Sequence, residues 1–129
     1  MGTFLTPALK SSRSGFSLVN DRTDLPIVTK LELAVDSVSR RKGLLGRDGL
    51  ADTTGIVIAP TNAVHTFFMR FPIDIVFVTR AGEVLKIRAA VPARRIAIAL
   101  RAFAVVELAA GCAARQDLRR GDFVSVRQI

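Results

Sequence analysis

The chain is poor in the residues from which most metal and redox sites are built. Its 129 residues include one cysteine, Cys112, and one histidine, His65. A single cysteine permits no internal disulfide, which agrees with a reducing cytoplasm. Metal sites usually take several histidine or cysteine ligands, so we predict neither a metal site nor a cofactor. The one alternative is a site of hard ligands formed by His65, Asp74 and Glu107.

Long apolar runs are also missing. The longest candidate, residues 89–106, is interrupted by Pro92 and by three arginines, whereas a membrane-spanning helix needs roughly 18 apolar residues in a row. The first ten residues lack the basic-then-apolar order of a signal peptide. We therefore expect a cytoplasmic protein with no membrane span.

Positive charge is abundant, with a formal net charge of +8. Such a charge admits nucleic acid as a partner. However, arginines outnumber lysines fifteen to four and alanine is abundant, which a GC-rich genome alone would produce. The basic clusters at 40–42, 94–95 and 119–120 are spread along the chain, and no aromatic residue adjoins them to stack a base. Nucleic-acid binding or regulation is therefore a second alternative, behind the functions considered below.

The order of apolar and turn residues predicts a mainly β protein. Residues 1–14 show no periodicity and are expected to form a flexible arm, while residues 15–129 are expected to form a single domain. Strands are predicted at 16–19, 27–35, 55–60, 65–71, 73–79, 83–91, 103–109 and 123–127, a turn or helix at 111–118, and a strand or helix at 94–100. A short helix is predicted with Asp36 or Ser37 as its N-cap and Gly43 or Gly46 as its C-cap. About eight short strands with regularly spaced turns indicate a compact β-sandwich or a partly closed barrel, with one or two short helices.

Residues 64–78 place charged groups inside an apolar run that reads as buried strand. Burial of a charge is costly unless the charge is paired, and Asp74 and Glu107 are each a lone carboxylate in an apolar strand. We favour a structural ion pair between Arg70 and Asp74 across the bend at Pro72. The functional alternative is a polar cluster in which Arg47 or Arg70 holds an anionic ligand.

An enzyme of hydrolase type is the first alternative function. His65 would be the general base, with Asp74 or Glu107 as its orienting group or as the acid. A histidine with no paired nucleophile is weak support, and a hydrogen-bonded histidine at a strand start is the simpler interpretation. Cys112 has no neighbouring base in the sequence, so we predict a buried structural thiol.

Two ordered motifs resemble the DUF192 (UPF0127) family. Residues 40–47 read RRKGLLGR and residues 65–77 read HTFFMRFPIDIVF, close to the family's commoner R-x-x-G-L-M-x-R and F-W-M-x-N-x-x-x-P-L-D. The later VELAAG at 106–111 and the Gly121-Asp122 pair are similar to its L-E-x-x-A-G and G-D blocks. The chain departs from the commoner form at Leu45, Phe68 and Arg70-Phe71, where Met, Trp and Lys-Asn are frequent.

The resemblance implies a compact, mainly β domain of sandwich or jelly-roll type and no agreed biochemical activity. The motif positions that carry over are Gly43, Arg47, His65, Met69, Pro72, Asp74, Glu107, Gly111, Gly121 and Asp122. We interpret most of them as architectural, since Gly and Pro set backbone geometry. We predict a small binding or accessory domain whose polar cluster binds an anionic ligand or a partner. That cluster comprises Arg47, His65, Arg70, Asp74 and Glu107.

Overall fold

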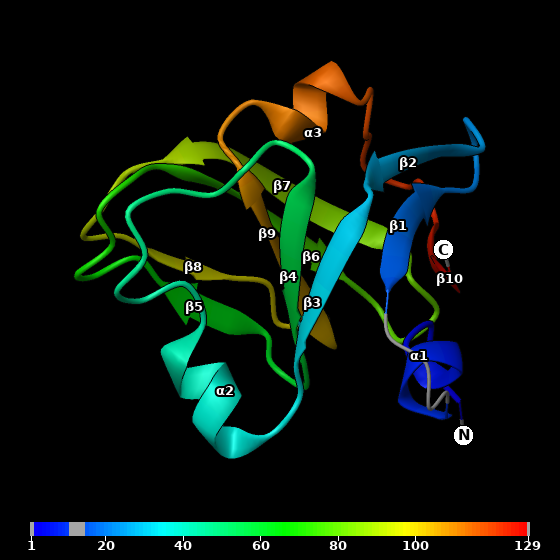
Figure 1. Ribbon diagram of the computed structural model, residues 1–129, viewed down its shortest axis with the longest axis horizontal. Coiled ribbons are helices and arrows are strands. Elements are labelled where there is room, and N and C mark those ends of the chain that lie inside the picture. Colours follow the sequence, from blue (N-terminus) through cyan, green and yellow to red (C-terminus); the bar gives the residue numbers. More distant parts are fainter. Residues whose placement is uncertain (1, 11–14, 129) are drawn as a thin grey trace.

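The computed structural model describes residues 2–10 and 15–128 and confirms a mainly β protein (Figure 1). Ten strands and three short helices lie within these residues. In chain order they are α1 (Thr6–Lys10), β1 (Phe16–Asn20), β2 (Leu25–Val28), β3 (Lys30–Ala34), α2 (Ser37–Lys42), β4 (Thr54–Ile58), β5 (Ala63–His65), β6 (Ile73–Val78), β7 (Val84–Val91), β8 (Ile96–Ile98), β9 (Ala104–Ala109), α3 (Cys112–Arg115) and β10 (Val124–Gln128). None of these helices combines the length and the apolar character needed to cross a bilayer.

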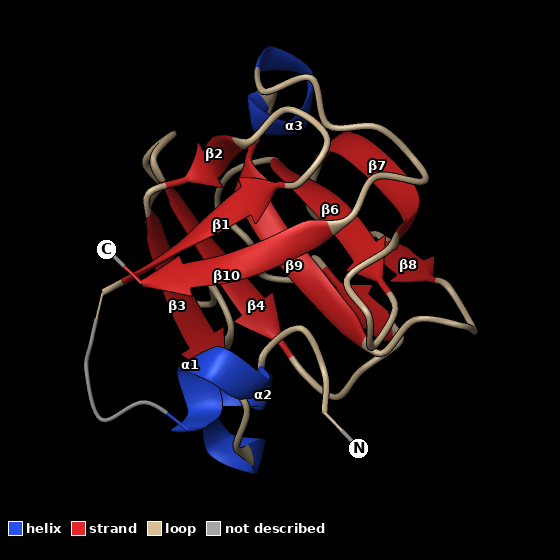
Figure 2. Cartoon of the chain, turned by 90° about the vertical axis from the view of Figure 1, so that its right-hand side faces the viewer, coloured by secondary structure: helices blue, strands red, loops and turns tan. Residues whose placement is uncertain are grey.

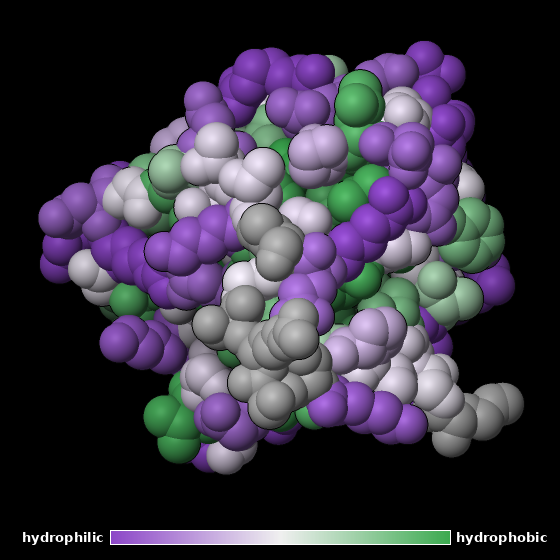
Figure 3. Space-filling view, turned by 45° about the vertical axis from the view of Figure 1, so that its right-hand side comes forward, coloured by the Kyte–Doolittle hydropathy of each residue, from purple (hydrophilic) through white to green (hydrophobic). Residues whose placement is uncertain are grey.

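The strands form three sheets. The central one has five strands in the order β3-β4-β9-β6-β7, in which only the β3–β4 pair is parallel. A three-stranded sheet, β10-β1-β2, crosses in front of it in Figure 2. The two-stranded ribbon β5-β8 and helix α2 lie toward the other side of the molecule, away from β1, β10 and α1 (Figure 1). Hydrophilic side chains with apolar groups between them cover the face seen in Figure 3.

The central sheet is buried on both faces. All six positions of β6 and all six of β9 are buried, and alternate residues point to opposite sides of the sheet. On β6, Val76 and Val78 join a first apolar cluster, whereas Ile75 and Phe77 join a second one. Side chains of β6 and β9 therefore alternate along each strand between the first apolar cluster and the second.

The N-terminal segment for which a flexible arm is predicted packs against the domain in the part that the structure describes. Phe4 and Leu5 are buried, with exposures of 9% and 1%, and the Phe4 N–H donates to the Arg80 carbonyl at 2.7 Å. Leu5 directly precedes α1 and Ala8 lies within it, about one helical turn further on. Both apolar side chains therefore reach the first cluster. Residue 1 and residues 11–14 lie outside the described residues.

The strand predicted for residues 65–71 is wrong beyond His65. The chain turns at Thr66, whose hydroxyl donates to the Pro92 carbonyl at 2.6 Å and accepts from the Arg95 N–H at 2.9 Å. The Met69 N–H then closes a turn on the Thr66 carbonyl. Phe68 lies in the left-handed region, with φ of 68°, and is 84% exposed. Apolar residues in this segment thus produced a strand pattern without being buried.

Candidate ligand-binding pocket

A pocket of about 400 Å³ lies between α2, β5 and the second apolar cluster of the core. Small-molecule sites in proteins commonly have this size. Its lining combines basic, apolar and acidic side chains: Ser37, Arg40, Arg41, Lys42, Gly43, Leu44, Leu45, Ile58, Thr61, Ala63, Val64, His65, Met69 and Glu107. The pocket thus brings together two of the predicted site residues, His65 and Glu107, and leaves Arg47, Arg70 and Asp74 outside its lining.

The ends of α2 shape one wall of the pocket. Asp36, one of the two N-cap candidates in the sequence, caps the helix by accepting a hydrogen bond from the Ser39 N–H at 2.8 Å. At the other end Gly43 has φ of 44°, and its N–H donates to the Ser39 carbonyl at 2.9 Å. A Cβ at position 43 would lie 3.7 Å from Glu107 Oε1. The absence of a side chain therefore leaves this carboxylate oxygen open to the pocket.

Glu107 reaches the pocket from the middle of the central sheet. On β9 it pairs with Ile56 of β4 on one side and Ile75 of β6 on the other, and it is 4% exposed. This burial raises the pKa of Glu107 to about 7, against the opposing effect of the Arg47 charge. No side chain or amide of the described residues donates a hydrogen bond to its carboxylate. Of the described side chains only Ser39 has a fully buried polar atom without a partner, so the Glu107 oxygens are accessible from the pocket, and their hydrogen-bond donor must come from there.

Arg47 lies near this carboxylate but binds another one. Its Nη1 and Nη2 donate to Glu32 Oε2 and Oε1 at 3.0 and 2.6 Å, a two-pronged pair. These hydrogen bonds lower the pKa of Glu32. Both guanidinium nitrogens are therefore occupied by Glu32. Arg47 contributes positive charge near Glu107, but it does not offer the unoccupied guanidinium that the predicted direct ligand contact requires.

The predicted ion pair between Arg70 and Asp74 is wrong. Arg70 donates to Asp48 at 2.6 Å on the exposed surface. Asp74 is fully buried and instead accepts three main-chain hydrogen bonds, from the N–H groups of Ala90 (2.8 Å), Gly111 (3.1 Å) and Ala113 (2.9 Å). Asp74 lies two residues before Val76 on β6, so its side chain points to the same side, toward the first apolar cluster. Glu107 points to the opposite side of the sheet. Its carboxylate anchors the start of α3 and the distal end of β7.

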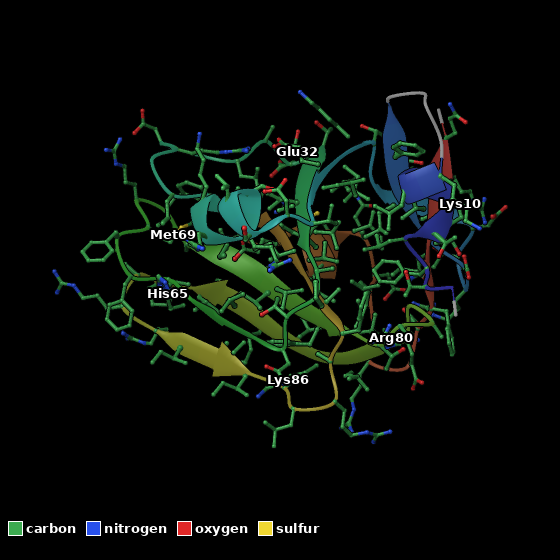
Figure 4. The ribbon with its side chains drawn as sticks, turned by 90° about the horizontal axis from the view of Figure 1, so that it is seen from below. Lys10, Glu32, His65, Met69, Arg80 and Lys86 are labelled. Carbon is green, nitrogen blue, oxygen red and sulfur yellow. The ribbon has the colours of Figure 1, made fainter. Side chains whose placement is uncertain are left out.

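His65 lies at the rim of the pocket and is exposed. Its ring is tilted against Phe67, with 5.7 Å between the ring centroids, and Figure 4 shows it on the same side of the molecule as Met69. Among residues 2–10 and 15–128, no carboxylate oxygen lies within 4.0 Å of a His65 nitrogen. The pairing that a histidine base needs with Asp74 or Glu107 is therefore not assembled here.

Cys112 is buried in the first apolar cluster, as expected for a structural thiol. Its Sγ lies 3.7 Å from both the Ile27 and the Asp52 carbonyl oxygens, and burial raises the pKa of the thiol. Within the part of the chain that the structure describes, no three His, Cys, Asp or Glu side chains lie close enough to hold a metal ion.

Sequence reasoning missed the basic rim of the pocket. Arg40, Arg41 and Lys42 form the last turn of α2 and line the pocket. In the sequence they stand out only as one of three basic clusters spread along the chain. Arg40 Nη1 donates to the Val35 carbonyl at 3.0 Å, whereas Arg41 is exposed. The only sequence signal for this arrangement was that Gly43, directly after the cluster, is a motif position.

A family model for DUF192 (Uncharacterized ACR, COG1430) matches residues 18–126. The chain belongs to the DUF192 family. This family has no established biochemical activity, and no curated protein matches the chain. Four of the positions that carry the family motifs, Gly43, His65, Met69 and Glu107, line the pocket.

Two solved structures share the fold of this DUF192 protein. A protein of unknown function from Novosphingobium aromaticivorans has 27% sequence identity and a TM-score of 0.74, over 86% of this chain and 83% of that one. A protein from Sinorhizobium meliloti, named "putative transcription regulator", has 22% identity and a TM-score of 0.75, over 90% and 98% of the two chains. The second similarity shows the fold alone.

Proposed function

We propose that this protein is a binding module for a small ligand and that its site is the pocket between α2 and β5. The observation that carries this proposal is Glu107, a buried carboxylate on the pocket wall with no donor from the described residues. Groups kept buried at a cost to stability are concentrated at functional sites. A bound ligand that donates a hydrogen bond would satisfy Glu107.

The basic residues of the pocket indicate a second chemical group of the ligand, besides the donor that binds Glu107. Arg40, Arg41, Lys42 and His65 line the pocket, and such a set of donors favours a carboxylate or phosphate group. Leu44, Leu45 and Met69 add apolar surface to the lining. The proposed ligand is therefore a small organic anion that also carries a hydroxyl, amide or ammonium donor.

Thermal denaturation of the full chain against amino acids, hydroxy acids and sugar phosphates tests this proposal. A compound present at about 100 times its Kd stabilises the folded state by about 2.7 kcal/mol, which raises the melting temperature by several degrees. Glu107→Gln and Arg41→Glu should each abolish or strongly reduce the rise. Glu83→Gln and Arg120→Glu, which make the same chemical changes outside the pocket, should leave it unchanged.

The proposal fails if no compound in the panel raises the melting temperature. It also fails if a compound does so equally well in the Glu107→Gln variant, because the ligand then binds elsewhere. A rise abolished equally by Arg120→Glu would show a nonspecific response to positive charge.

Nucleic acid is a second candidate partner, and its support is the net charge of +8 together with the name of the Sinorhizobium meliloti structure. Gel-shift titrations with duplex and single-stranded DNA at rising salt test it, because phosphate contacts predict a steep loss of affinity with salt. No shift at low salt would remove this candidate.

We propose a cytoplasmic location on the basis of the single, buried cysteine.

A further inference from the structure

A second surface stands out beside the pocket, because large apolar side chains gather on it in contact with solvent. Five of the nine exposed large apolar residues among those described come from two short segments. They are Phe67 (38% exposed), Phe68 (84%), Ile96 (61%), Ile98 (47%) and Leu100 (83%). Exposed apolar residues that occur singly are ordinary, whereas a contiguous group marks an interaction site.

The pairing of β5 with β8 places most of these residues on one face. His65 lies opposite Ile96 and Ala63 opposite Ile98, so these four side chains share the outer face of the ribbon. The intervening Ala97 points inward and is 2% exposed. Phe67 continues this face through its contact with the His65 ring. In Figure 4, β8 lies at the margin of the molecule, near Lys86.

Basic residues adjoin the same surface. Lys86 Nζ donates to the Ile98 carbonyl of β8 at 3.0 Å. The Thr66 N–H donates to the Arg95 carbonyl at 2.8 Å and the Arg94 N–H donates to the Thr66 carbonyl at 3.3 Å. Arg94 and Arg95 therefore flank the turn that carries Phe67 and Phe68. Neither arginine forms an ion pair with another residue of 2–10 or 15–128.

We propose that this surface, hereafter the docking face, binds the surface of a membrane that contains anionic lipids. The docking face comprises Phe67, Phe68, Ile96, Ile98 and Leu100 with the flanking Arg94, Arg95 and Arg101. Its apolar side chains enter the boundary between headgroups and acyl chains, and the arginines contact lipid phosphates. Nucleic acid would use the arginines and could stack on the phenylalanines, but it offers no apolar environment to Ile96, Ile98 and Leu100. A lipid surface accommodates all of these groups together.

Flotation of the full chain with vesicles tests the docking face. The protein should float with vesicles of phosphatidylcholine and phosphatidylglycerol and should not float with phosphatidylcholine alone. The double variant Phe68→Ser/Leu100→Ser should bind the anionic vesicles at least about tenfold more weakly, because it removes two large apolar side chains from the interface. Phe123→Ser, an exposed phenylalanine before β10 and outside the docking face, is the matched control.

A charge-reversal pair separates specific docking from general attraction. Arg94→Glu/Arg95→Glu should abolish flotation, while Lys30→Glu/Arg120→Glu, which changes the net charge equally at exposed sites elsewhere, should retain most of it. Glu107→Gln should leave flotation unchanged, so that failure of the pocket and failure of the docking face are distinguishable. All substituted positions in these pairs are exposed, and circular dichroism verifies that each variant is folded.

Several outcomes would overturn the proposal. The first is an absence of flotation with anionic vesicles. The second is an equal loss of flotation in both charge-reversal pairs. The third is vesicle binding that Phe68→Ser/Leu100→Ser leaves unchanged. A stable dimer in light scattering that dissociates in the Phe68→Ser/Leu100→Ser variant would assign the face to a second copy of the chain instead. Retention on single-stranded DNA without binding to vesicles would assign it to nucleic acid.

Discussion

Glu107 and Asp74 lie on the paired central strands β9 and β6, yet their carboxylates enter opposite layers of the molecule. Ile75 is the register partner of Glu107, and Asp74 is its neighbour along β6. Adjacent residues of a strand point to opposite sides of the sheet. On its side Asp74 accepts three main-chain hydrogen bonds, whereas Glu107 on the other side has no donor among the described residues. The two buried carboxylates therefore have separate roles: Asp74 holds the fold together, and Glu107 faces the pocket.

The stability of the protein should fall as the pH rises from about 4.5 to about 7. The pKa of Glu107 is raised from 4.5 to about 7 by burial, so in this range the folded state binds more protons than the unfolded one. The loss should be on the order of 3 kcal/mol for this group and should level off above about pH 7. Urea denaturation at a series of pH values measures it.

Glu107→Gln should remove this pH dependence and should be more stable than the wild type near about pH 8, since it takes away a buried charge. Glu83→Gln serves as the control and should keep the wild-type profile. Identical profiles for Glu107→Gln and the wild type would show that Glu107 titrates at its ordinary pKa.

Asp74→Asn should be among the most destabilising single substitutions in the protein. An amide offers one acceptor oxygen in place of two, and its NH₂ group would face a main-chain N–H. Each buried group left without a partner costs about 1–3 kcal/mol, so a total loss of roughly 3–5 kcal/mol is expected. Denaturant titration measures this loss. Asp48→Asn, which affects only the exposed pair with Arg70, should cost less than about 1 kcal/mol.

Asp122 should protect the fold against acid. Its carboxylate accepts hydrogen bonds from Arg22 Nε (2.8 Å), Asn20 Nδ2 (2.9 Å) and the Arg119 N–H (2.8 Å). The Arg22 hydrogen bond above all lowers the pKa of Asp122 from 3.8 to about 2. Its contribution is therefore present above about pH 4 and is lost as the pH falls toward about 2.

Asp122→Asn should accordingly cost roughly 2 kcal/mol at neutral pH and should flatten the acid limb of a stability–pH curve. The exposed Asp117 also pairs with Arg22 and Arg119, and Asp117→Asn provides the comparison, with an expected loss well below that of Asp122→Asn, because solvent screens exposed ion pairs. Equal losses for the two variants would contradict the importance assigned to burial at Asp122.

Cys112 should resist thiol reagents in the folded protein. Its thiol is buried, and desolvation raises its pKa, so the reactive thiolate is scarce. Labelling of the native protein with a chromogenic disulfide reagent should proceed only as fast as the protein opens, whereas the urea-unfolded chain should react at once. Immediate labelling of the native protein would place this thiol on the surface.

The sequence was a good guide wherever short-range patterns decide the structure. The Asp36 cap and the Gly43 helix end both follow from residues within a few positions of one another, and the pattern of apolar residues and the family resemblance both predicted the mainly β fold. The strand predicted through residues 65–71 failed because hydrogen bonds from Thr66 to residues 92–95, distant in sequence, turn the chain. Apolar composition alone could not show that Phe68 remains exposed.

The candidate site was only partly predictable, because its composition depends on tertiary pairing. Sequence reasoning selected Glu107 and His65, and they share one pocket. It could not show that the partner of Arg47 is Glu32, or that Asp74 is satisfied by amides from β7 and the start of α3. Asp74 and Glu107 each had several arginines available in the sequence, but in the fold neither accepts a hydrogen bond from an arginine of the described residues.

Chemical-shift mapping with a compound that raises the melting temperature tests the central claim most directly. In ¹⁵N-labelled full-length protein, saturating ligand should shift the amides of Gly43, His65 and Glu107, with the changes confined to the pocket lining, and Glu107→Gln should abolish them. Shifts centred on α3 and the Asp74 hydrogen bonds, or shifts that persist in Glu107→Gln, would contradict the assignment of this pocket as the binding site.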